Sequence, residues 1–247
     1  MKYSTITTKL LTATVMLALF SSCKKATVDY FNSPVITGGV PKIKTIDYGN
    51  KIRTNFYDES GRFTKATYSD GASSTATYSP NAVVFDSYNT LAALTQKDLY
   101  VLGADGLVTS STNSNNATST FYYYYNANKN LIYDTYISSG VLVRERFYQY
   151  VDGNLMYDSL KENGYWSTHT YERFMDINST TEQNNLGVDV LGQTSKNALK
   201  KVITKTSTGN VTTRVYEVPK TDAAGRISKV TYSENGNTPV STSYTYY

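Results

Sequence analysis

The chemistry open to this chain is limited by its single histidine, His169, and its single cysteine, Cys23. His169 lies in the strand-like segment STHTY, and no second histidine or cysteine is present to share a metal ion with it. A Ser-His-Asp triad would need His169 as its base, but the G-x-S-x-G turn that often presents the serine is missing. No glycine-rich phosphate-binding loop occurs either. We therefore predict that His169 is a solvent-facing strand residue, and that the protein has no metal and no cofactor.

Carboxylate pairs could still support glycoside hydrolysis if two acids converged. The recurrent acids are Asp58, Asp134, Asp158 and Asp222. Asp58 and Asp222 open the turns DESG and DAAG, and related turns carry Asn or Gly in their place. A turn tolerates such replacement, whereas a catalytic acid does not. We therefore assign all four acids structural roles and predict that the protein is not an enzyme; a carboxylate-based hydrolase is the least favoured alternative.

Aromatic side chains offer a different kind of site. The chain has 24 tyrosines, 8 phenylalanines and one tryptophan. Adjacent Tyr165 and Trp166 are the candidate binding residues, because flat rings can pack on sugar faces and anchor interfaces. The alternative, which we favour for Trp166, is that the indole packs in the core. A row of exposed rings on one face would favour binding, whereas a broad apolar patch would favour a structural component that braces a partner.

A repeat of about 24 residues shows which elements hold these side chains. NLIYDTYISSG (Asn130–Gly140) recurs as NLMYDSLKENG (Asn154–Gly164). Half of this spacing fits one strand of about eight residues and a short turn. The turns Asp58–Gly61 and Asp222–Gly225 combine an acid that can bond the backbone with a glycine that permits positive φ. We predict an all-β fold, an antiparallel β-meander of hairpin repeats in one domain over residues 42–247.

Three stretches depart from a simple meander. In RISKVTY, Ile227 and Val230 fall on opposite faces of a regular strand. Either a β-bulge lies between them, or both faces of the sheet are partly exposed to solvent. The polar stretch Thr109–Thr120 predicts a floppy hairpin tip. The segment Met175–Lys201 is too long for a turn. We favour a loop that only fills space over a lid that closes on a ligand.

The N-terminus carries an export signal. Met1–Ser22 has two lysines and an apolar run, Leu10–Phe20, of 11 residues, which is far shorter than the roughly 20 that a membrane helix needs. Small residues and Cys23 follow, and this order resembles the bacterial lipoprotein signal. The resemblance implies a lipid on Cys23, with residues 23–41 as lipidated N-terminus and tether. The alternative is an ordinary secretory signal with an incidental cysteine.

The hairpins resemble the YD-type repeats of bacterial surface proteins, and more closely a family of Bacteroidota lipoproteins of unknown function with a porin-like β fold. The likeness rests on the Asp-x-x-Gly-Arg-apolar-x-Lys units, on GQTSKNALKKV (Gly192–Val202) and on SYTYY (Ser243–Tyr247). It covers roughly Lys42 to Tyr247. It implies an envelope lipoprotein, anchored in the outer membrane on either face, with a strongly curved or barrel-like sheet and no catalytic residues.

The net charge and the order of polar and apolar residues in the strands argue against two classes of function. The formal net charge of +4 over 247 residues, without a basic stripe, argues against a nucleic-acid partner. TKATYSD and SSTATYS lack the alternating apolar residues of a membrane-spanning strand, so a pore is disfavoured. We predict a lipid-anchored cell-envelope protein that binds or presents a glycan or an envelope protein without catalysis; the alternative is a structural component that braces a partner complex.

Overall fold

The computed structural model describes residues 41–180 and 191–247, all of which belong to one compact unit. The predicted signal peptide, Cys23 and the tether lie outside these residues. No described helix is long and apolar enough to cross a membrane. The strands are β1 (Ile43–Asp47), β2 (Ile52–Tyr57), β3 (Phe63–Tyr68), β4 (Ser73–Ser79), β5 (Ala82–Tyr88), β6 (Leu94–Leu102), β7 (Val108–Asn113), β8 (Asn116–Tyr125), β9 (Leu131–Ser138), β10 (Val141–Val151), β11 (Asn154–Glu162), β12 (Tyr165–Asn178), β13 (Asn197–Thr206), β14 (Val211–Tyr216), β15 (Lys220–Thr221), β16 (Ile227–Glu234) and β17 (Val240–Tyr246).

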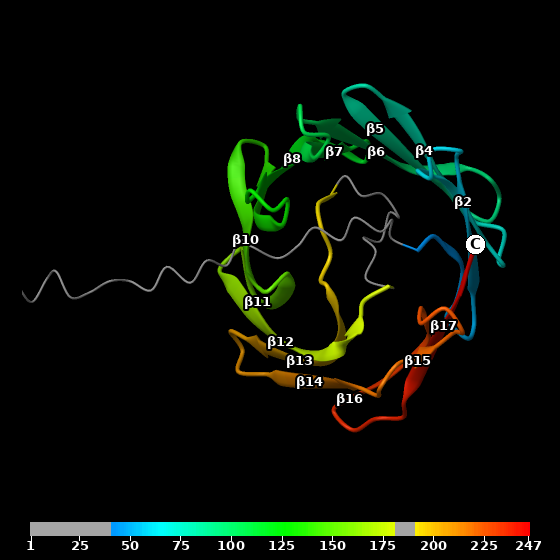
Figure 1. Cartoon of the computed structure of the whole chain (residues 1–247). Helices are drawn as coiled ribbons and strands as arrows, with labels where there is room; N and C mark the ends of the chain where they lie inside the picture. Colours follow the sequence, from blue (N-terminus) through cyan, green and yellow to red (C-terminus); the bar gives the residue numbers. More distant parts are fainter. Residues whose placement is uncertain (1–40, 181–190) are drawn as a thin grey trace, which may run out of the picture. The chain divides into compact units, whose positions relative to one another are not determined.

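These strands form a closed antiparallel barrel (Figure 1). Strands that follow one another in the chain pair with one another, and β1 pairs with β17 to close the ring. Short β15 lies beside β16 together with β14, so the ring has 16 positions. The predicted all-β meander in one domain is confirmed, and the sheet is closed. The two copies of the sequence repeat are the consecutive hairpins β9–β10 and β11–β12.

The turns at one end of the barrel explain why Asp and Asn replace each other. The Oδ1 atoms of Asp58, Asn126 and Asp222 each accept a hydrogen bond, 2.8–3.0 Å long, from the backbone N–H four residues on. An amide oxygen does this as well as a carboxylate. Gly61 and Gly225 have φ of 81° and 77°, so the prediction that they occupy equivalent turns with positive φ is confirmed.

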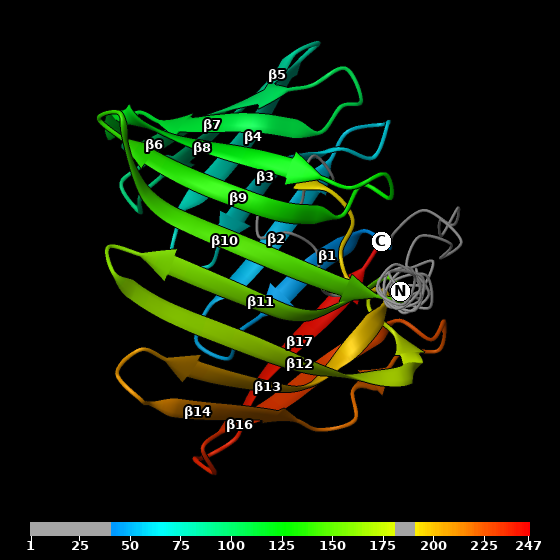
Figure 2. The same ribbon diagram turned by 90° about the vertical axis from the view of Figure 1, so that its left-hand side faces the viewer.

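The opposite end uses tighter turns. Ser139–Gly140 and Asn163–Gly164 are two-residue connections in which both residues have positive φ. This is the geometry that matches the twist of a hairpin and favours Asn-Gly. Figure 2 shows the hairpins β9–β10, β11–β12 and β13–β14 turning on the left of the view, with the C-terminal end of β17 on the right.

A β-bulge accounts for the irregular alternation in β16. The pairing of β15 with β16 skips Ser228, whose hydroxyl donates to the carbonyl of Lys220, 3.2 Å away. Ile227 therefore faces the barrel interior, and Val230, paired with Thr242, returns to the same face. Thr64 in β3 makes the matching bond to Phe56. Of the two alternatives left open by the sequence, the bulge is confirmed.

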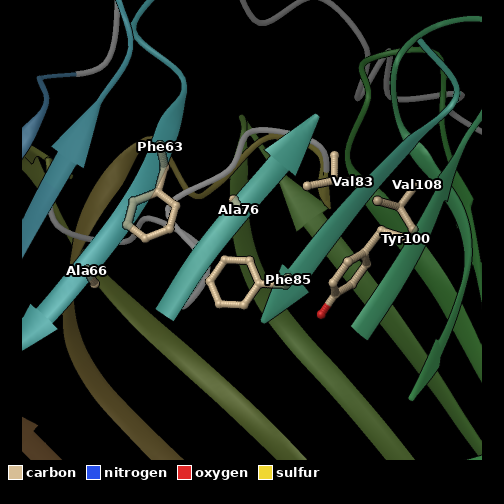
Figure 3. Close-up of a cluster of buried hydrophobic side chains, with 7 residues drawn as sticks. All are labelled: Phe63, Ala66, Ala76, Val83, Phe85, Tyr100 and Val108. Carbon is tan, nitrogen blue, oxygen red and sulfur yellow. The ribbon is translucent and has the colours of Figure 1, made fainter. Parts of the chain in front are cut away.

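The apolar core lies on the inner face of one side of the barrel, over β3 to β7 (Figure 3). Phe63 and Phe85 stack there with ring centroids 5.8 Å apart. The cluster consists of Phe63, Ala66, Ala76, Val83, Phe85, Tyr100 and Val108. Along β4 to β7 the core side chains alternate with residues of the outer wall, so only one face of these strands contributes to the core.

Two segments differ from the prediction. Thr109–Thr120 is not a floppy tip: β7 and β8 run through it, and only Ser114 and Asn115 lie between them. Small β-branched Thr residues favour strands, which the low complexity obscured. The insertion is also shorter than Met175–Lys201, because β12 continues to Asn178 and β13 begins at Asn197.

The described ends of the insertion contact opposite sides of the ring. The hydroxyl of Thr180 accepts a hydrogen bond from the backbone N–H of Ile227 in β16, at 2.8 Å, and bonds the Tyr246 hydroxyl in β17, at 3.0 Å. Beyond the gap, the N–H of Gln193 donates to the carbonyl of Lys129, between β8 and β9. The segment before β13 crosses the ring in Figure 1. The described residues at each end of the insertion are thus bonded to the barrel.

Candidate functional site

The inner face of β10 to β12 holds a buried carboxylate with four hydrogen bonds. Asp158 in β11 is 0% exposed. It accepts two bonds from the Arg146 guanidinium, 3.0 and 3.1 Å long, and one from the Tyr171 hydroxyl. Its Oδ1 lies 2.9 Å from Nδ1 of His169, the residue directly opposite on β12. Asp158 therefore links three neighbouring strands through their side chains.

A second buried carboxylate, Asp134 in β9, extends this cluster. Its oxygens accept from Nη2 of Arg144, at 2.8 Å, and from the Tyr148 hydroxyl, at 2.6 Å. Tyr148 lies directly opposite Asp158 across β10 and β11. The two carboxylates and their partners thus form one polar cluster on the inner wall, on the side away from the apolar core.

The electrostatics of the cluster follow from these bonds. Burial alone would raise the pKa of Asp158, but hydrogen bonds from His169 and Arg146 outweigh it and hold that pKa below its usual value. Burial raises the pKa of Tyr148, and nearby Asp134 raises it further. Burial and the Asp158 charge raise the pKa of Tyr171 in the same way. At neutral pH the aspartate is therefore charged and the phenols are protonated donors.

His169 is placed differently from the prediction. It is not solvent-facing but lies on the inner face with its side chain 22% exposed, because Ser167, His169 and Tyr171 alternate inward along β12. Its bond to Asp158 resembles the orienting half of a Ser-His-Asp triad. However, Nε2 makes no hydrogen bond to any residue that the structure describes, so no serine or threonine hydroxyl is poised for activation.

The four recurrent aspartates do not form one site. Asp58 and Asp222 hold Nε of Arg62 and Arg226 at 2.7 and 2.8 Å within their own turns. Asp134 and Asp158 lie in strands and are used as acceptors within the inner cluster. Among residues 41–180 and 191–247, no three His, Cys, Asp or Glu side chains come together in a way that could hold a metal ion.

The outer wall of β8 to β10 carries a row of three aromatic rings, which the sequence did not single out. Tyr124 pairs with Tyr133, and Tyr133 pairs with Phe147. The ring centroids are 5.4 and 4.5 Å apart. Tyr124 and Phe147, at the ends of the row, are each 49% exposed. The sequence shows the aromatic residues of this row within FYYYY and RFYQY. Which of them face outward can be decided only from the pairing register of β8, β9 and β10.

The predicted binding residues Tyr165 and Trp166 are exposed, at 41% and 46%. They do not form a joint surface, because consecutive strand residues point to opposite faces. Trp166 lies on the outer wall opposite Lys161. The favoured expectation that Trp166 packs in the core is wrong: it lies on the outer wall, one residue from the β11–β12 turn, and is about half exposed.

The remaining outer wall is rich in hydroxyl side chains. Thr45 is paired with Thr54 on one side and Thr245 on the other, and the hydroxyls of Thr45 and Thr245 bond at 2.7 Å. Thr67 and Thr75 continue this surface over β3 and β4. The aromatic row therefore lies on one side of a wall whose other side, from β16 through β17 to β4, carries mostly hydroxyl and charged side chains, with Ile52 and Phe56 of β2 as exposed apolar residues.

Comparison with solved structures supports the architecture. A porin-like protein from Bacteroides uniformis superposes with a TM-score of 0.64 at 17% sequence identity, over 83% of this chain and 98% of the other. At this identity the likeness establishes the fold, a porin-like β-barrel, and the porin-like part of the resemblance drawn from the sequence is supported. No protein-family model and no curated protein matches the sequence.

Proposed function

We propose that this protein is a cell-envelope β-barrel that binds a ligand without catalysis, and that the aromatic side of its outer wall is the contact surface. The carrying observation is the row Tyr124–Tyr133–Phe147. Exposed aromatic side chains are the residues that most often dominate binding free energy, and here three lie in register on a rigid sheet. Lipid attachment through Cys23, in the outer membrane, belongs to the same proposal.

A non-catalytic role is supported by the hydrogen bonds of the two buried aspartates. Asp158 and Asp134 direct their oxygens to arginine and tyrosine side chains, which leaves neither arranged as a free acid or nucleophile. Retaining and inverting glycosidases both need two carboxylates that face the substrate. The inner cluster instead joins β9 to β12 where the inner wall has no apolar core.

A membrane pore is not favoured, since the outer wall has charged residues within its strands. Lys65, Asp86 and Lys97 face outward in β3, β5 and β6, as their pairings with Thr75 and with each other show. A lipid-facing strand would carry apolar residues at these positions. The alternative of a structural component that braces a partner complex would use the same aromatic row as a protein contact.

The test compares the row with a matched aromatic residue elsewhere on the wall. Purified full-length protein is incubated with envelope polysaccharide and, separately, with solubilised envelope proteins followed by crosslinking. The double variant Tyr124→Ala/Phe147→Ala should lose retention of its ligand, whereas Phe56→Ala, which removes a ring 41% exposed on β2, should retain it. Equal retention by both variants, or turnover of the polysaccharide, would contradict the proposal.

A further inference from the structure

A small patch next to the aromatic row combines exposed rings with small hydroxyl side chains. On the outer wall Phe147 lies directly opposite Ser159, and Ser159 lies directly opposite Thr168. Tyr157 and Trp166 stand two residues away along β11 and β12, and the period of two puts them on the same face. We call Phe147, Tyr157, Ser159, Trp166 and Thr168 the outer-wall patch.

One face of the Phe147 ring is open toward this patch. Tyr133 covers the other face, with the ring centroids 4.5 Å apart. Opposite residues in an antiparallel pair have Cβ atoms about 5 Å apart, and the serine at position 159 is too short to cover a ring. This explains why Phe147 remains 49% exposed. Trp166, 46% exposed, stands diagonally across from Ser159.

The polar groups of the patch have no partner in the described part of the chain. The hydroxyls of Tyr157, Ser159 and Thr168 and the indole N–H of Trp166 make no hydrogen bond there. On the inner wall, by contrast, the Tyr148 hydroxyl is bound to a carboxylate. The patch therefore offers uncommitted donors and acceptors beside open ring faces on a rigid sheet.

Charges of both signs surround the patch. Glu145 and Lys161 lie directly opposite each other across β10 and β11, and Lys205 in β13 lies directly opposite Thr168. A ligand that fits must present an apolar face to a ring, offer many hydroxyls and carry no strong charge. Sugar rings have this chemistry. A strongly acidic polymer would bring its charge close to Glu145, beside the Phe147 ring, and a purely apolar surface would leave the hydroxyls of Ser159 and Thr168 buried without a partner.

We propose that the outer-wall patch binds a neutral oligosaccharide, with one sugar ring packed on Phe147 above Ser159 and the next residue of the chain reaching Trp166. This inference rests on the proposed binding function and names its ligand class. The hydroxyls of Ser159, Thr168 and Tyr157 and the Trp166 N–H bond the sugar hydroxyls.

The test is calorimetric titration of the full-length protein with three probes: cellohexaose, mannohexaose and, as the charged comparison, hexagalacturonate. Trp166→Ala removes a ring, and Ser159→Gln fills the space in front of Phe147 while leaving every ring in place. Each should weaken the Kd for the neutral probe by about tenfold or more. Phe56→Ala is the matched control and should leave the Kd unchanged, and circular dichroism checks that each variant folds.

Binding of a neutral probe that both variants weaken supports the site. Binding that survives Trp166→Ala and Ser159→Gln, binding of hexagalacturonate alone, or no binding of either neutral probe overturns it. If no sugar binds while crosslinking to an envelope protein is lost in Tyr124→Ala/Phe147→Ala, the glycan inference fails and the proposed function stands. If crosslinking is also unaffected, both fail.

Discussion

Replacing Asp158 with asparagine should destabilise the barrel by about 3 kcal/mol at neutral pH. The change keeps the size of the side chain but removes the charge that faces Arg146, and removing one partner of a buried ion pair costs about 3–5 kcal/mol because the other is left uncompensated. We take the low end for two reasons. The Arg146 side chain keeps 30% exposure, and its guanidinium lies 5.1 Å from the centre of the Tyr148 ring.

The pH dependence separates a charge effect from a packing effect. The pKa of Asp158 is lower in the folded state than its ordinary value of 3.8. A depressed pKa contributes stability that is present above the unfolded value and is lost as the pH falls through the folded value. The difference in free energy of unfolding between wild type and Asp158→Asn should therefore be full at pH 7 and shrink as the pH falls below about 4.

Urea unfolding followed by circular dichroism measures this difference. Asp222→Asn is the control: its Oδ1 position still accepts the turn bonds, and it loses only a partly exposed ion pair with Arg226, so we expect a much smaller loss of stability than for Asp158→Asn. A loss below about 1 kcal/mol for Asp158→Asn at pH 7 would refute the view that the inner cluster holds β10 to β12 together. A loss that does not change between pH 7 and pH 3 would show that shape, not charge, is responsible.

Gly61→Val and Gly225→Val should each lower the free energy of unfolding, measured in urea, by about 1–2 kcal/mol, because both residues have positive φ. Gly225→Val is the cleaner test, since no atom lies within 4 Å of the added Cβ. Wild-type stability of this variant would contradict the turn assignment. The free energy of unfolding should fall as the pH rises above about 10. Tyr148 and Tyr171 have raised pKa values in the folded protein, so above pH 10 the unfolded chain loses these phenol protons more readily than the folded one. If tyrosinate absorbance appears in full before the protein unfolds, this prediction is wrong. Cys23→Ser should move the protein from the membrane to the soluble fraction, and continued membrane partitioning would exclude the lipid anchor.

Local signals predicted the elements well, because each depends on few residues. The Asp and Gly of Asp58–Gly61 fix a turn by bonds within the turn itself, and the same chemistry recurs at Asp222–Gly225. The irregular spacing of Ile227 and Val230 left a bulge as one of two alternatives, and the structure shows the bulge. Closure of the ring is not local: it requires β1 to meet β17, and only the family resemblance implied it.

The polar cluster and the aromatic row were beyond sequence reasoning, because both depend on register. Asp158 could be called a strand residue, but its meeting with His169 follows from the exact pairing of β11 with β12. Bulges make this harder: between Gln149 and Tyr150 of β10 the partner in β11 moves from Tyr157 to Leu155, so the pairing cannot be continued by counting residues. Trp166 was expected in the core from its hydrophobicity, yet a barrel wall also has an outer side.

The seam between β1 and β17 has a consequence for how the chain folds. Thr45 and Thr245 are 200 positions apart, whereas every other neighbouring pair of strands is joined by a local connection. Hairpins can form early, but the seam must wait for the last strand to be made, and such long-range pairing is slow. Until then β1 and β17 are two open edges, which are templates for pairing with another chain. We therefore expect a chain that ends before Val240 to aggregate rather than to leave a smaller barrel.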